Sequence, residues 1–495
     1  MKFLKKSAIA VMAATVISAN AIGCVPMKYV VNPVLSASAA DIVDSGECGA
    51  EGSNLTWTLD SEGTLTISGE GEMPEWKYSD SPWYDNDSIL KVIIGKGVKN
   101  IAKNAFNSCA ITEVSISETV ENIQIDALSL YYLKNINVDE NNKNYKSVDG
   151  VLFDKSMSTL LNYPCKKEGN SYEIPNSVTS IGKEAFDNTF DLKTVIIPDS
   201  VTNIGEKAFS YCGLTEVKIP ASVTTIDNEA FTSSSRLEKI EVDEANTYFK
   251  SVDDVLFDKD MKTLVTYPSG KKNTSYIVPN GIATIGLCAF YGSGYLKNVT
   301  LSDTVTIIEE RAFFSCSNFE SIVITDNVTE IGNSVFYGDS KLASVKLPKS
   351  VGKIGLNAFG SCNSLALIEI ENPECDIYDY SATIYKTAVI SGYSGSTAQA
   401  YAEKYERDFV PLGDKPATPA YQLGDANADG KIDSSDASLI LAEYAIIQTG
   451  ANTTFTDDQK LAADVNKDGS VASTDASKIL AYYADSATGK EPSWD

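Results

Sequence analysis

The sequence predicts a mainly β solenoid built from short repeats, followed by a small all-α module at the carboxyl end. Two observations lead to this fold class. A pattern of about 23 residues recurs through the middle of the chain, and one copy is too short to bury its own apolar side chains, so neighbouring copies must stack. Near the end of the chain an acidic loop occurs twice, and each copy is followed by the same amphipathic segment.

Residues 1–39 have the composition of an export signal. Three lysines precede an apolar stretch at residues 8–17, which is too short to span a bilayer. Small residues allow cleavage after Ala39 or after Ala21, and we favour Ala39 because strand-like sequence begins just beyond it. Cys24 offers a weaker alternative, a lipid-modified amino terminus. The signal predicts a secreted protein.

Residues 40–88 are expected to form an N-terminal β cap. Leu55–Leu59 and Thr64–Ser68 alternate apolar and polar residues, and the segment Ser61–Gly63 between them has the composition of a turn. Such a hairpin is well placed to cover the open first end of a repeat array.

Residues 89–370 contain the repeats. The clearest copy reads Leu192-x-x-Val195-x-Ile197-Pro198-x-x-Val201-x-x-Ile204-Gly205-x-x-Ala208-Phe209. Because side chains alternate along a strand, Val195 and Ile197 should point inward while Thr194 and Ile196 face outward. The final position of the repeat recurs at Phe106, Leu128, Phe186, Phe209, Phe231, Phe290, Phe313, Phe336 and Phe359.

These repeats resemble the BspA-like leucine-rich repeats of bacterial surface and secreted proteins. The recurring Val-x-Ile-Pro and Val-x-x-Ile-Gly-x-x-Ala-Phe patterns carry the resemblance, which covers more than half of the chain. The resemblance implies a leucine-rich-repeat solenoid that binds proteins or surfaces rather than one that catalyses a reaction.

Two insertions interrupt the repeats. Residues 147–164 and 251–268 are near copies of one another, 104 positions apart. Each predicts a β-hairpin standing off one edge of the solenoid. Insertions that repeat on one face can mark a binding face, but their many apolar residues lead us to expect structural support.

Residues 371–412 are expected to form a C-terminal cap. Ser396 and Gln399 form a capping-box pattern that begins a helix reaching about Arg407. Residues 413–421 contain two prolines and predict a short, semi-stiff linker.

Residues 422–495 carry the two acidic loops. Oxygen-bearing side chains stand at loop positions 1, 3, 5 and 12, Gly430 or Gly469 stands at position 6, and a backbone carbonyl is expected at position 7. This pattern predicts two Ca²⁺ sites, although position 12 is Asp rather than the usual Glu. The predicted ligands are Asp425, Asn427, Asp429, Lys431, Asp433 and Asp436 in the first loop, and Asp464, Asn466, Asp468, Ser470 and Asp475 in the second.

A helix is expected after each loop, with apolar positions at Ala437, Ile440, Leu441 and Tyr444, and at Ala476, Ile479, Leu480 and Tyr483. Thr456 and Gln459 predict a third helix between them. The first loop lacks a preceding helix, so it is half of an EF-hand.

At these residues the segment resembles a dockerin, the module by which secreted bacterial proteins attach to cohesins of a cellulosome scaffold. The resemblance implies cohesin as the partner, with loop positions 10 and 11 in contact with it. The family usually has an acidic residue at position 9, as at Asp433, whereas Ala472 predicts a weaker or water-completed second site. The two copies also differ at Leu439 against Lys478 and at Glu443 against Tyr482. The expected contact residues are Ser434, Ser435, Leu439, Ser473, Thr474 and Lys478.

Composition excludes several classes of function. The net charge of −26 argues against nucleic acid and anionic membranes as partners. The chain contains no histidine, which removes Ser-His-Asp and Cys-His sites and His-ligated zinc. Of nine cysteines, four stand three residues after a repeat phenylalanine, so we expect buried thiols rather than disulfides.

The sequence therefore predicts a secreted, non-catalytic binding protein associated with polysaccharide degradation. A surface adhesin is the main alternative. A glycoside hydrolase component is disfavoured, because such enzymes need two carboxylates across a cleft and the repeats occupy the chain that a catalytic domain would need. Protein and glycan ligands stay open, since the outward strand positions carry neither an aromatic ladder nor a stripe of one charge. These positions include Glu216, Lys218, Lys239, Glu241, Asn298, Thr300, Ser344 and Lys346.

Overall fold

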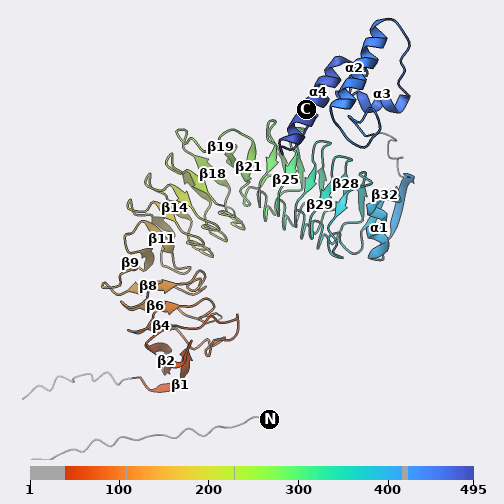
Figure 1. Cartoon of the computed structure of the whole chain (residues 1–495). Coiled ribbons are helices and arrows are strands. Elements are labelled where there is room, and N and C mark those ends of the chain that lie inside the picture. The colour runs from red at the N-terminus through yellow and green to blue at the C-terminus, as the bar shows by residue number, and fades with distance from the viewer. Residues whose placement is uncertain (1–39, 108, 228, 415–421, 495) are drawn as a thin grey trace, which may run out of the picture.

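The computed structural model describes residues 40–107, 109–227, 229–414 and 422–494. Up to residue 414 they form a curved stack of β coils, and residues 422–494 form a helical module (Figure 1). The predicted export signal and most of the predicted linker lie outside the described residues. The predicted fold class, a mainly β leucine-rich-repeat solenoid with two insertions and capping elements plus a small all-α module, is confirmed.

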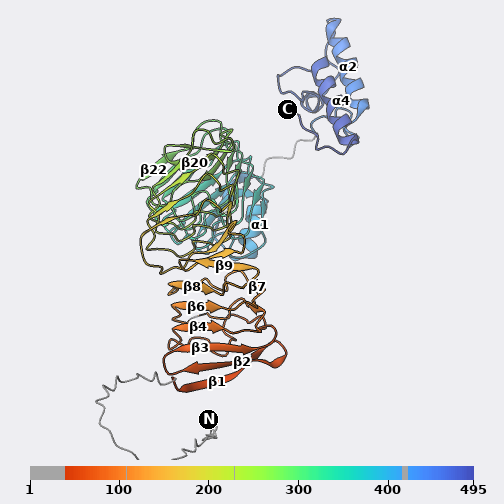
Figure 2. The same ribbon diagram turned by 90° about the vertical axis from the view of Figure 1, so that its left-hand side faces the viewer.

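The N-terminal cap is a three-stranded antiparallel sheet that continues into the solenoid. Its strands are β1 (Ile42–Gly49), β2 (Gly52–Asp60) and β3 (Thr64–Gly69). β3 then pairs in parallel with the first strand of the coils, so the cap covers the open end of the stack (Figure 2). The buried Trp83 donates its indole N–H to the carbonyl of Ala105 at 2.6 Å and stacks on Phe106, which fixes the cap to the first coil.

Each coil contributes one longer strand of three or four residues in the repeats, and successive strands pair mainly in parallel. Inward and outward positions alternate as predicted: Val195 and Ile197 are buried, whereas Ile196 is 52% exposed. The strands are β4 (Lys91–Ile94), β6 (Glu113–Ile116), β8 (Asn135–Val138), β12 (Ser171–Glu173), β14 (Thr194–Ile196), β16 (Glu216–Ile219), β18 (Lys239–Val242), β22 (Ser275–Ile277), β24 (Asn298–Thr300), β26 (Ser321–Val323), β28 (Ser344–Leu347) and β30 (Leu367–Ile370).

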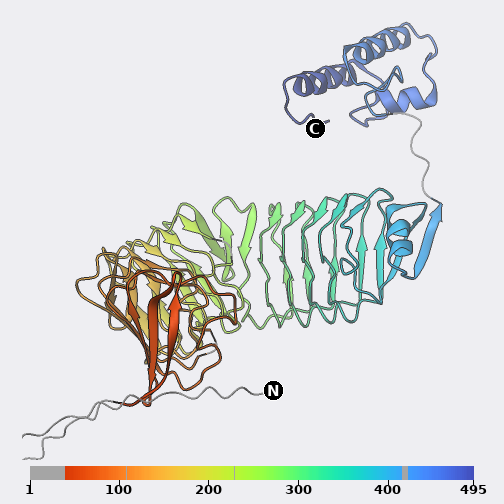
Figure 3. The ribbon, with the colours of Figure 1, turned by 60° about the horizontal axis from the view of Figure 1, so that its bottom comes forward.

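A second set of parallel strands, each two residues long, precedes the Gly-x-x-Ala-Phe turns. Beneath them the repeat phenylalanines form columns of stacked rings, with centroids 5.0 Å apart for Phe186 and Phe209 and 4.8 Å apart for Phe290 and Phe313. The coils lie side by side in Figure 3. The short strands are β5 (Asn100–Ile101), β7 (Asn122–Ile123), β13 (Ser180–Ile181), β15 (Asn203–Ile204), β17 (Thr225–Ile226), β23 (Thr284–Ile285), β25 (Ile307–Ile308), β27 (Glu330–Ile331), β29 (Lys353–Ile354) and β31 (Asp376–Ile377).

The two insertions form hairpins, but they do not stand off the solenoid. Their last strands pair in parallel with β13 and β23, so each hairpin extends a sheet of short strands, and its central strand is buried. The apolar core divides into three clusters at these two places. The insertions therefore join separate stretches of core. Their strands are β9 (Tyr145–Val148), β10 (Val151–Asp154) and β11 (Thr159–Asn162), then β19 (Phe249–Val252), β20 (Val255–Asp258) and β21 (Thr263–Thr266).

A fully buried asparagine fixes the start of each insertion. The side-chain amide of Asn142 donates to the carbonyls of Ser117 and Val120, and its oxygen accepts from the N–H groups of Asn144 and Tyr145. Asn246 makes the equivalent four contacts in the second insertion. Pattern reasoning does not find these residues, because each lies in an otherwise exposed loop sequence.

The C-terminal cap contains the predicted helix but only half of the predicted capping box, since the side chain of Gln399 accepts from the N–H of Gly395 and not from that of Ser396. The hydroxyl of Ser396 accepts from the N–H of Gln399, and helix α1 (Thr397–Lys404) ends three residues before the expected Arg407. In the chain, the helix connects the last two strands, β32 (Val389–Ser394) and β33 (Phe409–Asp414). These strands pair with one another and extend the sheet of β28 and β30 in parallel.

The helical module contains α2 (Ser434–Gln448), α3 (Asp457–Ala463) and α4 (Ser473–Ala487). α2 and α4 pack on one another, and Thr456 with Gln459 caps α3 as predicted. The eight described cysteines are buried and unpaired, which confirms the expectation for them; Cys24 lies outside the described residues.

We predict that Asn142→Ala lowers the free energy of unfolding of the amino-terminal part of the solenoid by about 2–4 kcal/mol, because two buried carbonyls and two N–H groups lose their partner. The neighbouring Asn141→Ala is the matched control, since Asn141 is exposed and should change stability by less than about 0.5 kcal/mol. Urea unfolding followed by the fluorescence of Trp57, Trp76 and Trp83, which lie in this part of the core, measures both. Equal midpoints for the two variants would contradict the anchoring role.

Candidate docking module and grooves

In the first acidic loop the predicted ligand side chains fold back onto the loop backbone. The carboxylate of Asp425 accepts from the N–H groups of Asp429 at 3.0 Å and Gly430 at 2.8 Å. The carboxylate of Asp436 accepts from the N–H groups of Asn427 and Asp433. Gly430 has φ +81°, a left-handed conformation that favours glycine at this sharp turn.

The second loop repeats this arrangement with one difference. Asp464 accepts from the N–H groups of Asp468 and Gly469, and Asp475 from those of Asn466 and Ala472. In the first loop, the carboxylate of Asp433 also accepts from the N–H of Ser435 at 2.7 Å, and Ala472 has no oxygen to do so. The helix after the second loop therefore begins without a side-chain cap.

The donor chemistry of the loops suits a hard divalent cation. Carboxylate, amide and carbonyl oxygens occur within twelve residues, which is the ligand set that Ca²⁺ takes in such loops. Burial, together with the neighbouring carboxylates, raises the pKa of Asp436 and of Asp475 above the ordinary value, so negative charge at these positions is unfavourable without a bound cation. No three acidic, histidine or cysteine side chains of the described residues form a metal-ligand group by themselves.

The helices bury only part of the predicted apolar face. Ala437, Ile440, Ala476 and Ile479 are buried. Leu441 and Leu480 are each 44% exposed and Tyr483 is 43% exposed, so their assignment to the inward face was wrong. The i+4 positions lie at the edge of the helix–helix contact, where a short two-helix pair leaves them in solvent.

Buried Glu443, which stands where the second copy has Tyr482, lies inside the module. Its carboxylate accepts from the hydroxyls of Thr453 and Thr454 and from the N–H of Thr454 at 2.7 Å, and so holds the loop before α3. The difference between Glu443 and Tyr482 therefore acts inside the module.

The C-terminal tail accounts for the other internal differences. The ring of Trp494 stacks on that of Tyr482, with centroids 4.2 Å apart. The backbone carbonyl of Trp494 accepts from the ammonium group of Lys478. The same ring lies against Gly424, where a Cβ would come within 2.5 Å of it. Lys478, which we expected at the cohesin surface, is thus engaged within the module, and its counterpart Leu439 packs against the core.

Once these internal positions are set aside, the exposed faces of α2 and α4 carry nearly the same residues. Over the first twelve residues of the two helices, six corresponding positions are exposed in both, and five of these six pairs are identical. The six pairs are Ser434 and Ser473, Ser435 and Thr474, Ser438 and Ser477, Leu441 and Leu480, Ala442 and Ala481, and Ala445 and Ala484. In the last turn, the exposed pairs Ile447 and Ser486, and Gln448 and Ala487, differ.

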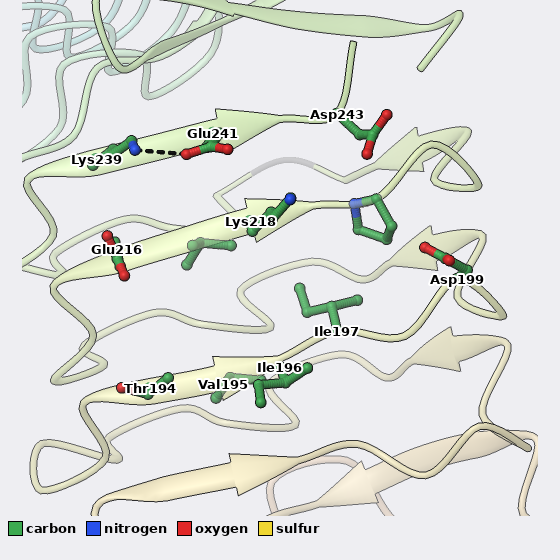
Figure 4. Close-up of a pocket in the computed structure, with 12 residues that line it drawn as sticks. Thr194, Val195, Ile196, Ile197, Asp199, Glu216, Lys218, Lys239, Glu241 and Asp243 are labelled. Carbon is green, nitrogen blue, oxygen red and sulfur yellow. Dashed lines mark hydrogen bonds and ion pairs between the residues drawn. The ribbon is translucent and has the colours of Figure 1, made fainter. Parts of the chain in front are cut away.

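The outer face of the solenoid strands contains a groove of about 480 Å³ over β14, β16 and β18, which we call the strand-face groove (Figure 4). Four of the expected outward residues line this groove. The ammonium group of Lys239 lies 2.6 Å from the carboxylate of Glu241. The four are Glu216, Lys218, Lys239 and Glu241. The other expected positions, Asn298, Thr300, Ser344 and Lys346, lie on β24 and β28 outside this groove.

A larger groove of about 700 Å³ lies along the turns that carry the repeat phenylalanines, and we call it the turn-face groove. Sequence analysis missed its ring ladder, whose signal is an aromatic residue directly after the repeat phenylalanine. Tyr291 stacks on Phe314 with centroids 4.9 Å apart, and Phe314 stacks on Tyr337 at 5.1 Å. Ser210, Tyr211, Thr232, Ser334 and Asn357 also line the groove.

Charged side chains join the coils along the turn-face groove. The carboxylate of Glu229 lies 3.2 Å from the ammonium group of Lys207 and 3.3 Å from the guanidinium of Arg311, beyond the second insertion. Asp126 and Glu184 are hydrogen-bonded to one another across the first insertion. Burial, with the Asp126 contact, raises the pKa of Glu184 to about 8, so one proton is shared by this pair.

Comparison with family models decides the identity of the repeats. The model of the BspA type leucine rich repeat region matches residues 79–168, 163–270 and 266–383, which together make up more than half of the chain. The chain belongs to the BspA-type leucine-rich repeat family. The model of the dockerin type I domain matches residues 423–482, so the helical module is a dockerin.

Several solved structures are similar to the chain at low identity. A leucine-rich repeat protein from Eubacterium ventriosum is 22% identical, with 75% of this chain and 85% of that chain covered and a TM-score of 0.44. A leucine rich cell surface protein from Faecalibacterium prausnitzii is 22% identical, with 74% and 94% covered and a TM-score of 0.46. The pneumococcal vaccine antigen PcpA is 20% identical, with 72% and 97% covered and a TM-score of 0.45. No curated protein matches the chain.

A BspA-type repeat region joined to a dockerin indicates a binding protein that attaches to a cohesin-type partner and acts outside the cell or at its surface. Dockerin type I domains bind calcium. Within the described part of the chain, no helix combines the length and apolar character that crossing a bilayer requires.

We predict that Glu184→Gln makes the BspA-type solenoid more stable than the natural protein at about pH 8.5, and that this advantage shrinks toward about pH 4. The folded-state pKa of Glu184 is raised to about 8, whereas the unfolded value is near 4.3, so the stability that its proton supplies is lost as pH rises through this window. Melting temperatures across the pH range measure the effect. Glu206→Gln, at an exposed residue paired with Lys183, is the control, and the same pH profile in both variants would contradict the shared proton.

Proposed function

We propose that this protein is a secreted, non-catalytic component of a cellulosome-type assembly associated with polysaccharide degradation. Its repeat solenoid binds a protein or glycan surface, and its calcium-dependent dockerin attaches it to a cohesin of the scaffold. The observation that carries the proposal is the pair of matching exposed faces on α2 and α4, beside loops that have calcium-ligand chemistry.

We propose that the predicted domain bounds hold, with an export signal at residues 1–39 and a linker at residues 413–421 between the C-terminal cap and the dockerin, the first two linker residues being the end of β33. Cleavage after Ala39 would leave β1 as the first element of the secreted protein. The linker then separates the docking function from the binding function.

The proposed dockerin binds two calcium ions. The first is held by Asp425, Asn427, Asp429, Asp433 and Asp436 with the carbonyl of Lys431, and the second by Asp464, Asn466, Asp468 and Asp475 with the carbonyl of Ser470. Each ion would offset the negative charge that burial makes unfavourable at the end of the loop. It would also fix the start of the helix whose face meets the cohesin.

The proposed cohesin contacts begin at the exposed hydroxyls of Ser434, Ser435, Ser473 and Thr474. Exposed Leu441 and Leu480 lie farther along the same helices and add an apolar contact to each face. Leu439 and Lys478 contribute indirectly, since they pack within the dockerin.

A non-catalytic role agrees with the chemistry of the turn-face groove. The two carboxyl groups there that share a proton, Asp126 and Glu184, touch one another. Glycoside hydrolysis needs carboxyl groups about 5–10 Å apart, so that a sugar or a water fits between them. This pair is too close for that reaction.

We predict that removing calcium abolishes cohesin binding by the full chain and lowers its helical circular dichroism signal, with both restored by added Ca²⁺. The helices of the solenoid are few, so the helical signal reports mainly on the dockerin.

Asp425→Ala should weaken cohesin binding more than Asp464→Ala, because the first loop has Asp433 where the second has Ala472. Calorimetry with and without chelator measures this, and calcium-independent binding would defeat the proposal.

We predict that the dockerin uses either of its two faces. Leu441→Glu and Leu480→Glu should each leave cohesin affinity within about threefold of the natural value, and the double variant should lose it by more than about a hundredfold. Leu461→Glu, at a leucine of α3 that is 53% exposed, is the matched control and should have no effect. Loss of binding in either single variant would show that one face alone is used.

A further inference from the structure

The turn-face groove has a regular spacing along the solenoid. Its ring ladder repeats every 4.9–5.1 Å over three coils, at Tyr291, Phe314 and Tyr337. Ser210 and Thr232 take the same place in the two repeats before the second insertion. A ligand that lies along the groove therefore meets a hydroxyl group or an aromatic ring in each of these coils.

An extended peptide does not match this spacing. It rises about 3.3 Å per residue and repeats its side-chain direction after about 6.6 Å, so it loses register with the coils within a few residues. A pyranose ring in an extended 1,4-linked chain is about one coil spacing long. A polysaccharide can therefore place one sugar against each coil.

Phe314 offers its edge to the groove, because Tyr291 and Tyr337 cover its two faces. Aromatic edges carry positive partial charge and attract hydroxyl oxygens. Tyr211 differs, since it is 44% exposed and no other described aromatic ring stacks on it. Its hydroxyl is hydrogen-bonded to that of Tyr291, which fixes the ring beside the ladder. Its free face suits stacking on a sugar ring.

The charges of the groove favour an uncharged ligand. Both cations that line it, Lys207 and Arg311, are already paired with Glu229. Asp126 and Asp187 add acidic groups nearby. A uronic acid would thus meet carboxyl groups without a free cation to bind it.

We propose that the turn-face groove binds a segment of a neutral polysaccharide that lies along the solenoid, with about one sugar per coil. This inference rests on the proposed binding role of the solenoid and names the class of its ligand. The groove spans coils from Asp126 to Asn357 and is lined by coils before and after each insertion, although no residue of the insertions lines it.

Affinity electrophoresis of the full, calcium-loaded chain tests the proposal, with xyloglucan and glucomannan as neutral probes and polygalacturonate as the anionic one. We expect at least one neutral polymer to retard the chain and polygalacturonate not to do so. Tyr211→Ala should weaken binding about tenfold or more. Thr232→Trp, which fills the groove, should abolish binding. Tyr248→Ala removes a tyrosine that is 53% exposed and lies outside the groove, so it should bind as the natural protein does.

Three results would overturn the inference: no retardation by either neutral polymer, unchanged binding in both Tyr211→Ala and Thr232→Trp, or binding of polygalacturonate as tight as that of the neutral polymers. Cohesin binding measured on the same samples keeps the two proposals apart. Intact cohesin binding with no polysaccharide binding overturns only the ligand assignment, whereas lost cohesin binding in the natural chain counts against the docking proposal.

Discussion

The solenoid depends on one repeated contact at the last residue of each repeat. The backbone N–H of that phenylalanine donates to the carbonyl of the residue before the next one, as from Phe186 to Ala208 at 2.8 Å and from Phe290 to Ala312 at 2.7 Å. Its ring stacks on the next ring at nearly the same spacing. This geometry places the residue two positions earlier in a left-handed conformation, at Glu184, Lys207, Glu229 and Arg311 among others. Those side chains line the turn-face groove, so coil stacking and groove formation have a common cause.

The repeat pattern predicts most of the solenoid because the pattern and the packing have the same period. The inward positions of β14, the buried cysteines and the helix caps at Ser396 and Thr456 follow from local spacing. The path of the insertions does not. The pairing of β11 with β13 is set by how one coil meets the next, and the anchor Asn142 makes contacts more than twenty residues away. The ring ladder does not follow from the strand pattern, because its residues lie in turns.

The dockerin shows the same division between local and distant information. The loops and helices can be predicted from their residues, and the near-identity of the two copies is visible in the sequence. The sequence alone does not reveal which differences face inward. The helical pattern places Glu443 and Lys478 at the surface. In the fold, Glu443 is covered by the loop of Thr453 and Thr454, and Lys478 is bound by Trp494 of the C-terminal tail. The outer faces are alike over most of their length, and two of the residues that differ between the copies, Glu443 and Lys478, hold one loop and one tail.

The last strand of the solenoid, β33, has two roles. It closes the sheet by pairing with β32, and its end at Asp414 leads into the linker of the dockerin. If a cohesin holds the dockerin and a ligand holds the solenoid, as we propose, mechanical tension between them enters the solenoid through this strand. A strand pulled along its own axis loads all of its hydrogen bonds together, whereas a strand pulled sideways gives them up one at a time. Under sideways load β33 would detach first and lengthen the tether, while the coils behind α1 stay stacked. The cap would then open before the binding surface does, and so protect that surface from the load.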